Sequence, residues 1–298
     1  MAVIDTALVR RLLRGQFPEW ADRPITPLAS GGTVNAVYRL GDDLTVRLPR
    51  TAEDVAGERR ILSVLGGLPV SVPAVAALGE PAEGFPRPWA VHRWLDGEPA
   101  VEGAPARGLA EFVTALRATC ADGPPAYRGK PLSSVDTGVR RAIDELSRTG
   151  EPFDADAALA AWTAALEAPQ WTGPPCWVHS DLMPSNLLLD DGRLTGVLDW
   201  ATAGLGDPAC DLIPAWNLLT AADREPFRDA VGADDATWAR GRGWALAMAV
   251  IQLPYYRHTN PVISANARYV LSELGCRPAP RSATAPRGRS DRAPHTSP

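Results

Sequence analysis

The chain has 298 residues, of which 45% are hydrophobic and 22% are charged, and its formal net charge at pH 7 is −5. This length allows one large core or two lobes of ordinary domain size. The negative charge argues against a protein that binds nucleic acid without sequence preference, because such binding needs a basic face.

Four cysteines are scattered along the chain, with no CxxC pair and no zinc-like cluster of cysteine and histidine. They indicate neither a disulfide framework nor a zinc site. Residues 1–17 have charges inside their apolar stretch and no small-residue cleavage site, so they predict an amphipathic helix and not a signal peptide. No apolar run approaches the length of a membrane span, about 20 residues. We therefore expect a cytoplasmic protein that binds neither nucleic acid nor membrane.

The first third of the chain has the pattern of a small β-rich lobe. Ile4, Leu8 and Leu12 lie on one face of a predicted N-terminal helix. Two alternating segments on either side of the turn at residues 41–43 predict a β-hairpin, and a glycine-rich bend at residues 30–32 precedes it. The expected elements, in chain order, are a helix over 4–14, strands over 34–40 and 44–48, a helix over 52–65, and strands over 74–78 and 89–95.

Beyond residue 96 the pattern becomes mostly helical, with one β-rich patch over residues 176–200. Helical periodicity extends over residues 106–120, 139–146, 157–166, 212–219, 224–231, 236–253 and 261–274. The last stretch is rich in Pro, Arg and Ser without apolar spacing, which predicts a disordered tail. The expectation is an α+β fold with a β-rich N-lobe over residues 1–95, a larger helical C-lobe over 96–276 and a tail over 277–298.

Polar residues interrupt the apolar β-rich patch. His179, Asp181 and Asn186 lie within the segment VHSDLMPSNLLL, and Asp199 follows the next apolar stretch. A buried carboxylate is destabilising unless it is paired or bound to a cation. Two carboxylates and an amide on adjacent β segments form an oxygen-rich site suited to Mg²⁺, which shares phosphate oxygens as ligands.

The spacing of these residues is that of kinase-type phosphoryl transfer. In that reaction an Asp accepts the proton of the acceptor hydroxyl, a later Asn binds magnesium, and an Asp on the next strand binds the metal that bridges the phosphates. The pattern predicts Asp181 as the catalytic base and Asn186 and Asp199 as magnesium ligands. The alternative is a turn-forming Asp181 and a capping Asn186. For His179 we expect a structural role that orients the loop.

These motifs resemble those of the aminoglycoside phosphotransferase family, the antibiotic kinases related to protein kinases. Residues 198–212, LDWATAGLGDPACDL, are similar to the family's metal-binding Asp segment. Residues 31–39, GGTVNAVYR, are similar to its nucleotide loop, and residues 45–50, TVRLPR, to the strand with the phosphate-binding cation. The resemblance extends over residues 25–275 and implies the two-lobed protein-kinase-like fold.

The resemblance also implies ATP or GTP as the phosphate donor and Mg²⁺ as the cofactor. Arg47 would bind phosphate oxygens with Glu58 as its partner; Glu53 is the competing partner, and a solvated surface pair is the alternative. Residues 94–97 are similar to the hinge between the lobes. The implied nucleotide-binding residues are Ser30, Gly31, Gly32, Arg47, Glu58, Arg93 and Leu95.

The sequence departs from related proteins at two positions of these motifs. Arg47 stands where protein kinases have lysine, and the only lysine of the chain, Lys130, lies far downstream. Arginine has the same charge and can bind phosphate through two nitrogens, so Arg47 keeps the role. Ser180 stands where the family usually has glycine after the motif histidine, a small change that we expect to be tolerated.

Other polar and aromatic residues near these motifs are expected to be structural. Asp207 and Asp211 would brace the segment that follows the metal site. Trp216 and the pair Tyr255 and Tyr256 would pack in the core, with the acceptor pocket as the alternative place.

By resemblance the protein transfers the γ-phosphoryl group to a hydroxyl of a small molecule, an aminoglycoside or another antibiotic, as a monomer or homodimer. The acceptor would bind between the helices after Asp211 and those around residues 104–120. Two alternatives stay open: a kinase of a small metabolite such as choline or homoserine, and a pseudokinase-like module that binds nucleotide without turnover. The second would lack Asp181, Asn186 or Asp199, and all three are present. No P-loop motif occurs.

Overall fold

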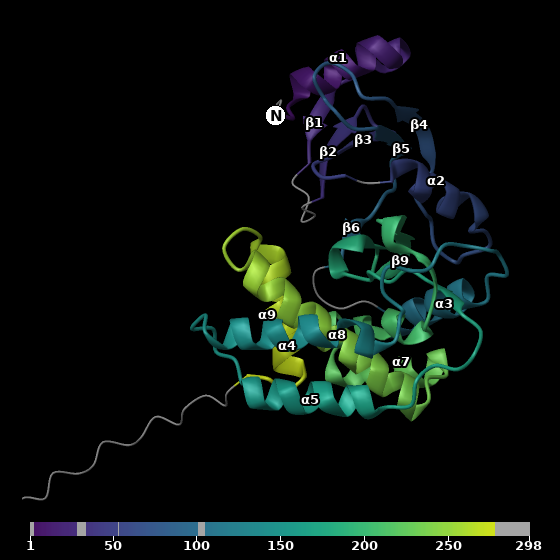
Figure 1. The fold of residues 1–298 in the computed structure, drawn as a ribbon. Helices are drawn as coiled ribbons and strands as arrows, with labels where there is room; N and C mark the ends of the chain where they lie inside the picture. Colours follow the sequence, from purple (N-terminus) through teal and green to yellow (C-terminus); the bar gives the residue numbers. More distant parts are fainter. Residues whose placement is uncertain (1–2, 29–33, 53, 101–104, 278–298) are drawn as a thin grey trace, which may run out of the picture.

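The computed structural model describes residues 3–28, 34–52, 54–100 and 105–277. The chain has two lobes, a small one built around an antiparallel sheet and a larger, mainly helical one (Figure 1). Two separate clusters of buried hydrophobic residues form their cores. The structure therefore confirms the α+β, two-lobed architecture.

The N-lobe sheet has five antiparallel strands in the order β1-β2-β3-β5-β4. The elements of this lobe are α1 Thr6–Gln16, β1 Ile25–Pro27, β2 Asn35–Leu40, β3 Leu44–Pro49, α2 Val55–Val64, β4 Val75–Gly79 and β5 Trp89–Arg93. Helix α1 begins after Asp5, whose carboxylate accepts a hydrogen bond from the Leu8 N–H over 2.8 Å. Leu8 and Leu12 on its buried face share one core with Tyr38 and Val46 of the sheet. The apolar stripe of α1 therefore covers one face of the sheet.

Helix α2 contacts both lobes. Asp54 caps its first turn by accepting a backbone hydrogen bond over 2.7 Å. Ile61, on its buried side, belongs to the hydrophobic cluster of the C-lobe and not to that of the N-lobe. The chain after α2 continues this attachment, because Ser71 donates to and accepts from the backbone of the C-lobe strand β9 (Arg193–Val197) over 2.8 and 3.0 Å.

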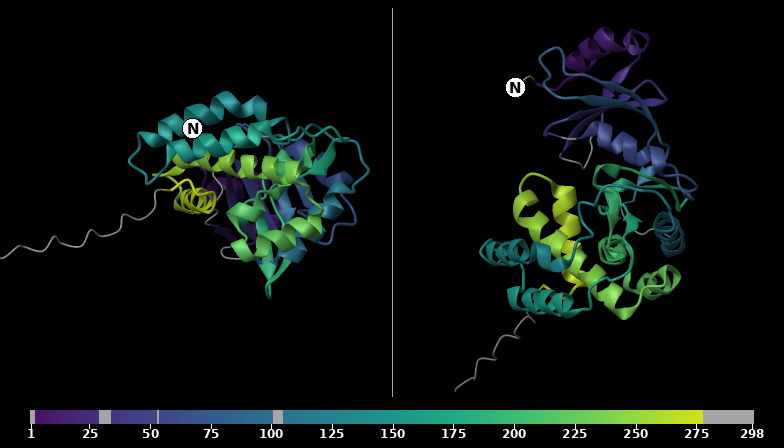
Figure 2. Two further views of the ribbon diagram at one scale, coloured as in Figure 1. Left: turned by 90° about the horizontal axis from the view of Figure 1, so that it is seen from below. Right: turned by 45° about the vertical axis from the view of Figure 1, so that its right-hand side comes forward.

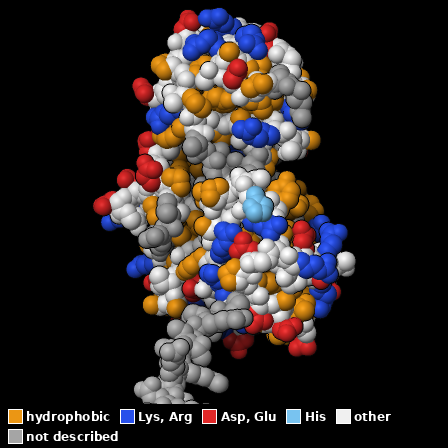
Figure 3. All heavy atoms as spheres, turned by 90° about the vertical axis from the view of Figure 1, so that its left-hand side faces the viewer, with side chains coloured by type: hydrophobic (Ala, Val, Ile, Leu, Met, Phe, Trp, Pro, Cys, Tyr) orange, Lys and Arg blue, Asp and Glu red, His pale blue; other side chains and the backbone are white. Residues whose placement is uncertain are grey.

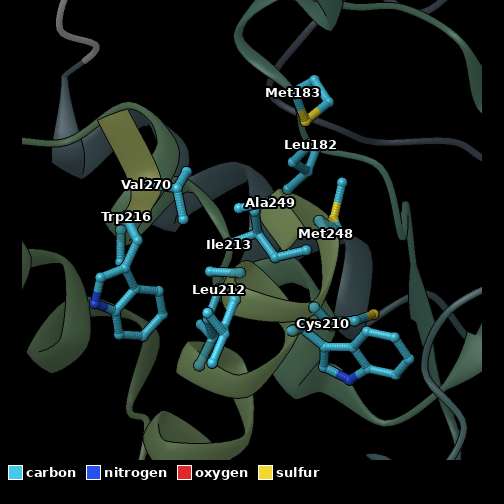
Figure 4. Packing of buried hydrophobic residues seen from close by; sticks show 14 of the residues in the cluster. Leu182, Met183, Cys210, Leu212, Ile213, Trp216, Met248, Ala249 and Val270 are labelled. Carbon is cyan, nitrogen blue, oxygen red and sulfur yellow. The ribbon is translucent and has the colours of Figure 1, made fainter. Parts of the chain in front are cut away.

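The C-lobe surrounds the long helix α8 (Figure 2). Its elements are β6 Glu98–Pro99, α3 Ala106–Arg117, α4 Asp136–Ser147, α5 Ala155–Glu167, β7 Cys176–Val178, β8 Leu187–Asp190, β9, β10 Gly204–Gly206, α6 Pro214–Asn217, α7 Ala221–Val231, α8 Asp235–Tyr256 and α9 Pro261–Glu273. Buried residues lie all round the middle of α8, because α4, α5 and α9 pack against it. Leu182 and Met183, which follow β7, lie above Met248 and Ala249 of α8 in this core (Figure 4).

The predicted helix over residues 212–219 is wrong in extent. The chain there forms a 3₁₀ turn at Pro208–Leu212 and then the short helix α6, which begins at Pro214. Proline has no N–H to donate, so one regular helix does not run through this position. Within the described ranges, no helix is both long and apolar enough to span a membrane.

Candidate active site

Arg47 and Glu58 form an ion pair inside the N-lobe. Arg47 Nη1 lies 3.0 Å from Oε1 and 3.3 Å from Oε2 of Glu58. Arg47 is on β3, the middle strand, between the buried Val46 and Leu48, so strand alternation turns its side chain to the opposite face. The Arg47 side chain is 16% exposed and that of Glu58 is buried, so the pair is not the solvated surface pair considered as the alternative. The competing partner Glu53 lies outside the described residues.

The same ion pair reaches the C-lobe at two points. Arg47 Nη2 lies 3.5 Å from Oδ1 of Asp199. Glu58 Oε1 accepts a hydrogen bond from the Trp200 N–H over 3.2 Å. The predicted phosphate-binding cation and a predicted metal ligand, 152 residues apart in the sequence, therefore meet where the lobes face each other. Figure 3 shows the recess between the two lobes.

The predicted base and the first metal ligand share one tight loop, residues 179–186 between β7 and β8, which we call the catalytic loop. Asn186 Nδ2 donates to the backbone oxygen of Asp181 over 2.9 Å. The Leu198 N–H donates to the backbone oxygen of Asn186 over 2.8 Å. These bonds hold Asp181, Asn186 and the residue before Asp199 in fixed relative positions.

Two buried polar side chains brace the catalytic loop. Asp211 has no exposed surface and accepts hydrogen bonds from the N–H groups of His179 and Ser180 over 2.7 and 2.8 Å. The His179 ring lies 2.9 Å from the Leu198 carbonyl at Nε2 and accepts at Nδ1 from the Asp181 N–H over 3.3 Å. Because a carbonyl only accepts, these contacts assign the proton of the neutral ring to Nε2. His179 and Asp211 thus act as structural braces, as the sequence predicts.

Ser180 and Asp199 have left-handed backbone conformations, with φ of +64° and +62°. This conformation costs a residue with a side chain about 1 kcal/mol, whereas glycine adopts it freely. The preference of related sequences for glycine at the position of Ser180 follows from this geometry. The Ser180 hydroxyl compensates by donating to the Thr202 carbonyl over 2.8 Å. The structure thus accommodates the serine.

The Asp181 carboxylate lies in a strongly perturbed environment. Burial raises the pKa of Asp181, and the charge of Asp199 raises it further. Arg128 opposes both effects and lowers the pKa of Asp181, because its Nη1 lies 2.9 Å from Oδ1 of the carboxylate. A carboxyl group that is perturbed by burial and by a specific charged partner is typical of a functional site.

Arg128 is the site residue that the sequence analysis does not identify. It lies in the loop between α3 and α4, and Nη1 also donates to the Ser180 carbonyl over 2.9 Å. No motif surrounds it, and the glycine that follows is too common a signal to select it. Its place beside Asp181 depends on contacts between distant segments, which local sequence patterns do not report.

The residues predicted to bind magnesium fit that ion. Because Asn186 Nδ2 is bonded to Asp181, its Oδ1 is left to coordinate a cation. The Asp199 side chain is 39% exposed, and its contact with Arg47 is long. Among the residues that the structure describes, no group of three or more His, Cys, Asp or Glu could hold a metal ion. One carboxylate and one amide oxygen, completed by phosphate and water, are a donor set that suits Mg²⁺ and not Zn²⁺.

In the predicted hinge, the backbone groups of one residue, Leu95, have no backbone partner among the described residues. Arg93 Nη1 lies 3.2 Å from the Asp43 carboxylate, so this side chain is paired at the β2–β3 turn, away from the Arg47 face of the sheet. Leu95 forms no backbone hydrogen bond to any described residue, which leaves its N–H and C=O free for a ligand. Three predicted nucleotide-loop residues lie outside the described ranges: Ser30, Gly31 and Gly32.

The expectations for the neighbouring aromatic and acidic residues are met except at the tyrosine pair, because Tyr256 is half-buried and belongs to neither core cluster. Trp216 is buried. Asp207 accepts a hydrogen bond from Arg240 Nε over 2.6 Å, which is a structural brace. Tyr255 is 74% exposed, so the expectation that it packs in the core is wrong. The last turn of α8 extends beyond the core, and there the Tyr255 ring packs edge-on against Tyr256.

Comparisons with known proteins concern the family and the fold of the chain. The sequence model of the phosphotransferase enzyme family matches residues 25–244. The GDP complex of aminoglycoside 2'-phosphotransferase-IIIa has a TM-score of 0.66 at 17% identity and covers 91% of this chain and 99% of that chain. Macrolide 2'-phosphotransferase MphH from Brachybacterium faecium has a TM-score of 0.56 at 24% identity, covering 89% and 97%. Identities this low establish the shared fold alone.

A curated relative adds a local match. The uncharacterized protein YcbJ of Bacillus subtilis (strain 168) is 46% identical over 44 residues, which is 14% of either chain. The family model agrees with the phosphotransferase motifs of the sequence, and the solved structures show that the chain has the fold of antibiotic phosphotransferases.

Proposed function

The chain belongs to the phosphotransferase enzyme family and is a kinase-type enzyme with a hydroxyl acceptor, and from this premise we propose its donor, its metal and the roles of its site residues. The donor is ATP or GTP, the metal is Mg²⁺, and the γ-phosphoryl group is transferred to a hydroxyl of an antibiotic or a small metabolite.

One observation supports this proposal above the others. Arg47 contacts Glu58 in its own lobe and Asp199 in the other lobe, over 3.0 and 3.5 Å. In protein kinases a cation on the corresponding strand, a glutamate on the following helix and an aspartate that binds magnesium must be assembled together for phosphoryl transfer. A non-catalytic module has no need for this assembly together with an intact Asp181 and Asn186.

Each residue then has a distinct task. Arg47 donates hydrogen bonds to phosphate oxygens, and Glu58 fixes its direction. Asn186 and Asp199 would hold Mg²⁺, which would neutralise the negative charge of the phosphates. Asp181 orients the acceptor hydroxyl and accepts its proton, in the manner of a general base. The backbone N–H and C=O of Leu95, which have no backbone partner among the described residues, would bond the nucleobase.

The acceptor class can be narrowed by charge. The structures similar to this chain include complexes of related enzymes with kanamycin, gentamicin and streptomycin, and macrolide phosphotransferases. Hydrogen bonds connect α9 to the catalytic loop. Asn266 of α9 donates to the Asn217 carbonyl over 2.7 Å, and Asn217 donates to the Leu182 carbonyl of that loop over 2.9 Å. Residues 236–272 of α8 and α9 contain no Asp or Glu. A polycation would find no carboxylate between Asp235, the first residue of α8, and Glu273, the last residue of α9.

We therefore propose two candidate acceptor classes. An aminoglycoside is the first, because antibiotic kinases of this fold act on it. The second is a hydroxyl compound without several positive charges, such as a macrolide or a small metabolite, and the absence of acidic residues between Asp235 of α8 and Glu273 of α9 favours it.

A release assay for the nucleoside diphosphate tests the proposal. The purified protein is incubated with Mg²⁺, with ATP or GTP, and with aminoglycosides, macrolides or amino alcohols in parallel. We expect acceptor-dependent release with at least one class, and loss of that release in the Asp181→Asn variant. Tight nucleotide binding without release in any arm would instead identify the pseudokinase-like module.

A further inference from the structure

Arg128 places a permanent positive charge beside the proposed base. Its Nη1 donates to Oδ1 of Asp181 and to the carbonyl of Ser180, each over 2.9 Å. The side chain is 20% exposed, so the guanidinium is partly desolvated. An acceptor hydroxyl that approaches Asp181 must therefore approach Arg128 as well.

The backbone holds Arg128 in place on both sides. The Tyr127 N–H donates to the Thr202 carbonyl over 3.0 Å, and the Gly129 carbonyl accepts from the Asp207 N–H over 2.8 Å. The segment just before them forms a parallel bridge with β10. The loop is thus held to β10 like an additional strand, so the backbone of Arg128 has little freedom and the position of its guanidinium is fixed.

Most of the hydrogen-bonding capacity of Arg128 is unused. Only Nη1 has a hydrogen-bond partner among the described residues, and neither Nε nor Nη2 is among the buried atoms. Arg240, a bracing arginine of the same lobe, uses all three of its nitrogens. The Nε/Nη2 edge has two parallel N–H groups that match the oxygens of a carboxylate or phosphate.

We propose that the Nε/Nη2 edge of Arg128 binds an anionic oxygen next to the acceptor hydroxyl. The inference rests on the proposed function, because it takes Asp181 as the residue that orients that hydroxyl. Two groups can present such an oxygen at this point: the phosphoryl group during its transfer, and a carboxylate or phosphate of the acceptor itself. The chemistry of recognition is the same, and binding experiments separate the two sources.

Titration calorimetry on the full chain tests the proposal with three probes. The first is Mg·ADP alone. The second is Mg·ADP with aluminium fluoride, a planar mimic of the transferred phosphoryl group. The third is D-glycerate in the presence of Mg·ADP, compared with glycerol, which lacks the carboxylate. Arg128→Gln removes the charge and the paired N–H groups, Arg128→Lys keeps the charge only, and Arg107→Gln, which is exposed on α3, is the matched control.

We expect Arg128→Gln to bind Mg·ADP like the wild type but to lose about 10- to 100-fold in affinity for an anionic probe, the usual effect of losing hydrogen bonds to a charged group. Arg128→Lys should recover part of this loss, and Arg107→Gln should show none. A loss confined to the aluminium fluoride complex assigns the edge to the phosphoryl group. A loss for glycerate and not for glycerol assigns it to the acceptor.

Two results would overturn the inference. If Arg128→Gln binds all probes like the wild type and loses only kcat, Arg128 merely orients Asp181. Should the glutamine variant not fold, the same conclusion follows if Arg128→Lys binds all probes like the wild type and loses only kcat. If the wild type binds no Mg·ADP, the proposed function itself fails, which the first probe reports independently of Arg128.

Discussion

The carboxylate of Glu58 accepts a hydrogen bond from the Trp200 N–H over 3.2 Å, although the two residues belong to different lobes. The same carboxylate pairs with Arg47, so the direction of the Arg47 guanidinium depends on how the lobes meet. Removing one partner of a buried ion pair leaves an uncompensated charge, which is strongly destabilising.

Arg47→Ala should raise the nucleotide KM and lower kcat together, because the side chain contacts both Glu58 and Asp199. We expect a loss of about 10- to 100-fold in kcat/KM, the range for hydrogen bonds to a charged group. Arg47→Lys should be partly active, since the charge remains but the paired N–H groups do not. Steady-state kinetics decides this, with Arg50→Ala as an exposed control. Wild-type kinetics in Arg47→Ala would place the phosphate-binding cation elsewhere.

Asp181→Asn should lower turnover by at least about 10²-fold, the usual effect of losing a general base. Nucleotide affinity should change little, because the bonds that hold the loop come from the backbone of Asp181 and from Asp211. Turnover is measured with an acceptor identified by the release assay, and affinity by calorimetry. Retention of most of the wild-type kcat would remove Asp181 from the mechanism.

Asp199→Ala should abolish the magnesium dependence of nucleotide binding. Asp199 is the only carboxylate of the two predicted ligands, and no group of three potential ligands within the described residues could replace it. Calorimetry with ATP in the presence and absence of Mg²⁺ is the measurement. Asp190→Ala, an exposed acidic residue at the end of β8, is the control. Equal magnesium dependence in Asp199→Ala and wild type would contradict the assignment.

His92 should make the fold sensitive to acid. Burial lowers the pKa of His92 to about 3, and the positive charge of Arg47 contributes to the decrease. The pKa is low even though the Nε2 atom of His92 lies 3.8 Å from the carboxylate of Glu58. Below the ordinary histidine pKa of about 6.5 the unfolded chain binds a proton that the folded chain excludes, so stability falls as the pH decreases. This one group would account for about 3 kcal/mol by pH 4.

His92→Leu should remove that part of the pH dependence and leave stability at pH 7 close to that of wild type. Neither ring nitrogen of His92 has a hydrogen-bond partner within the described residues, so the leucine leaves no bond broken. Urea unfolding between pH 4 and pH 7 is the measurement, with the exposed His258→Leu as the control. An unchanged slope in His92→Leu would show that the histidine titrates normally in the folded chain.

Ser180→Gly should be nearly neutral, whereas Ser180→Val should be destabilising. Glycine relieves the left-handed strain, about 1 kcal/mol, and loses the hydroxyl bond to Thr202, of similar size. Valine loses the same bond and adds a branched side chain at φ +64°, so we expect a cost of about 2–4 kcal/mol. Chemical denaturation compares both with Ser272→Val, an exposed helical control. A stable Ser180→Val variant would mean that the loop conformation is not required.

The sequence predicts the parts of the site that are locally encoded. Asp181, Asn186 and Asp199 are recognisable because they interrupt an apolar run at the spacing of a known chemistry. Helix α1 and strands β2 and β3 are recognisable because their apolar residues repeat with the period of the element, over six or more residues.

Other features arise only when distant segments meet. Arg128 joins the site through pairing with β10, a three-residue strand of sequence GLG that has no period to detect. The exposure of Tyr255 depends on how far α8 extends past the helices that cover it, and the extent of α6 on the backbone limits of Pro214. Tertiary contacts decide the first two, whereas the start of α6 is set locally by Pro214.

The attachment of α2 has a consequence for how the enzyme opens. The sheet that bears Arg47 and the helix that bears Glu58 are anchored in different hydrophobic cores, since Ile61 of α2 packs with the C-lobe. If the sheet moves away from the C-lobe, α2 stays with the C-lobe, and the contacts of Arg47 with both Glu58 and Asp199 must break. Opening therefore removes the partners that orient the Arg47 guanidinium, so the open state would bind phosphate more weakly than the closed state.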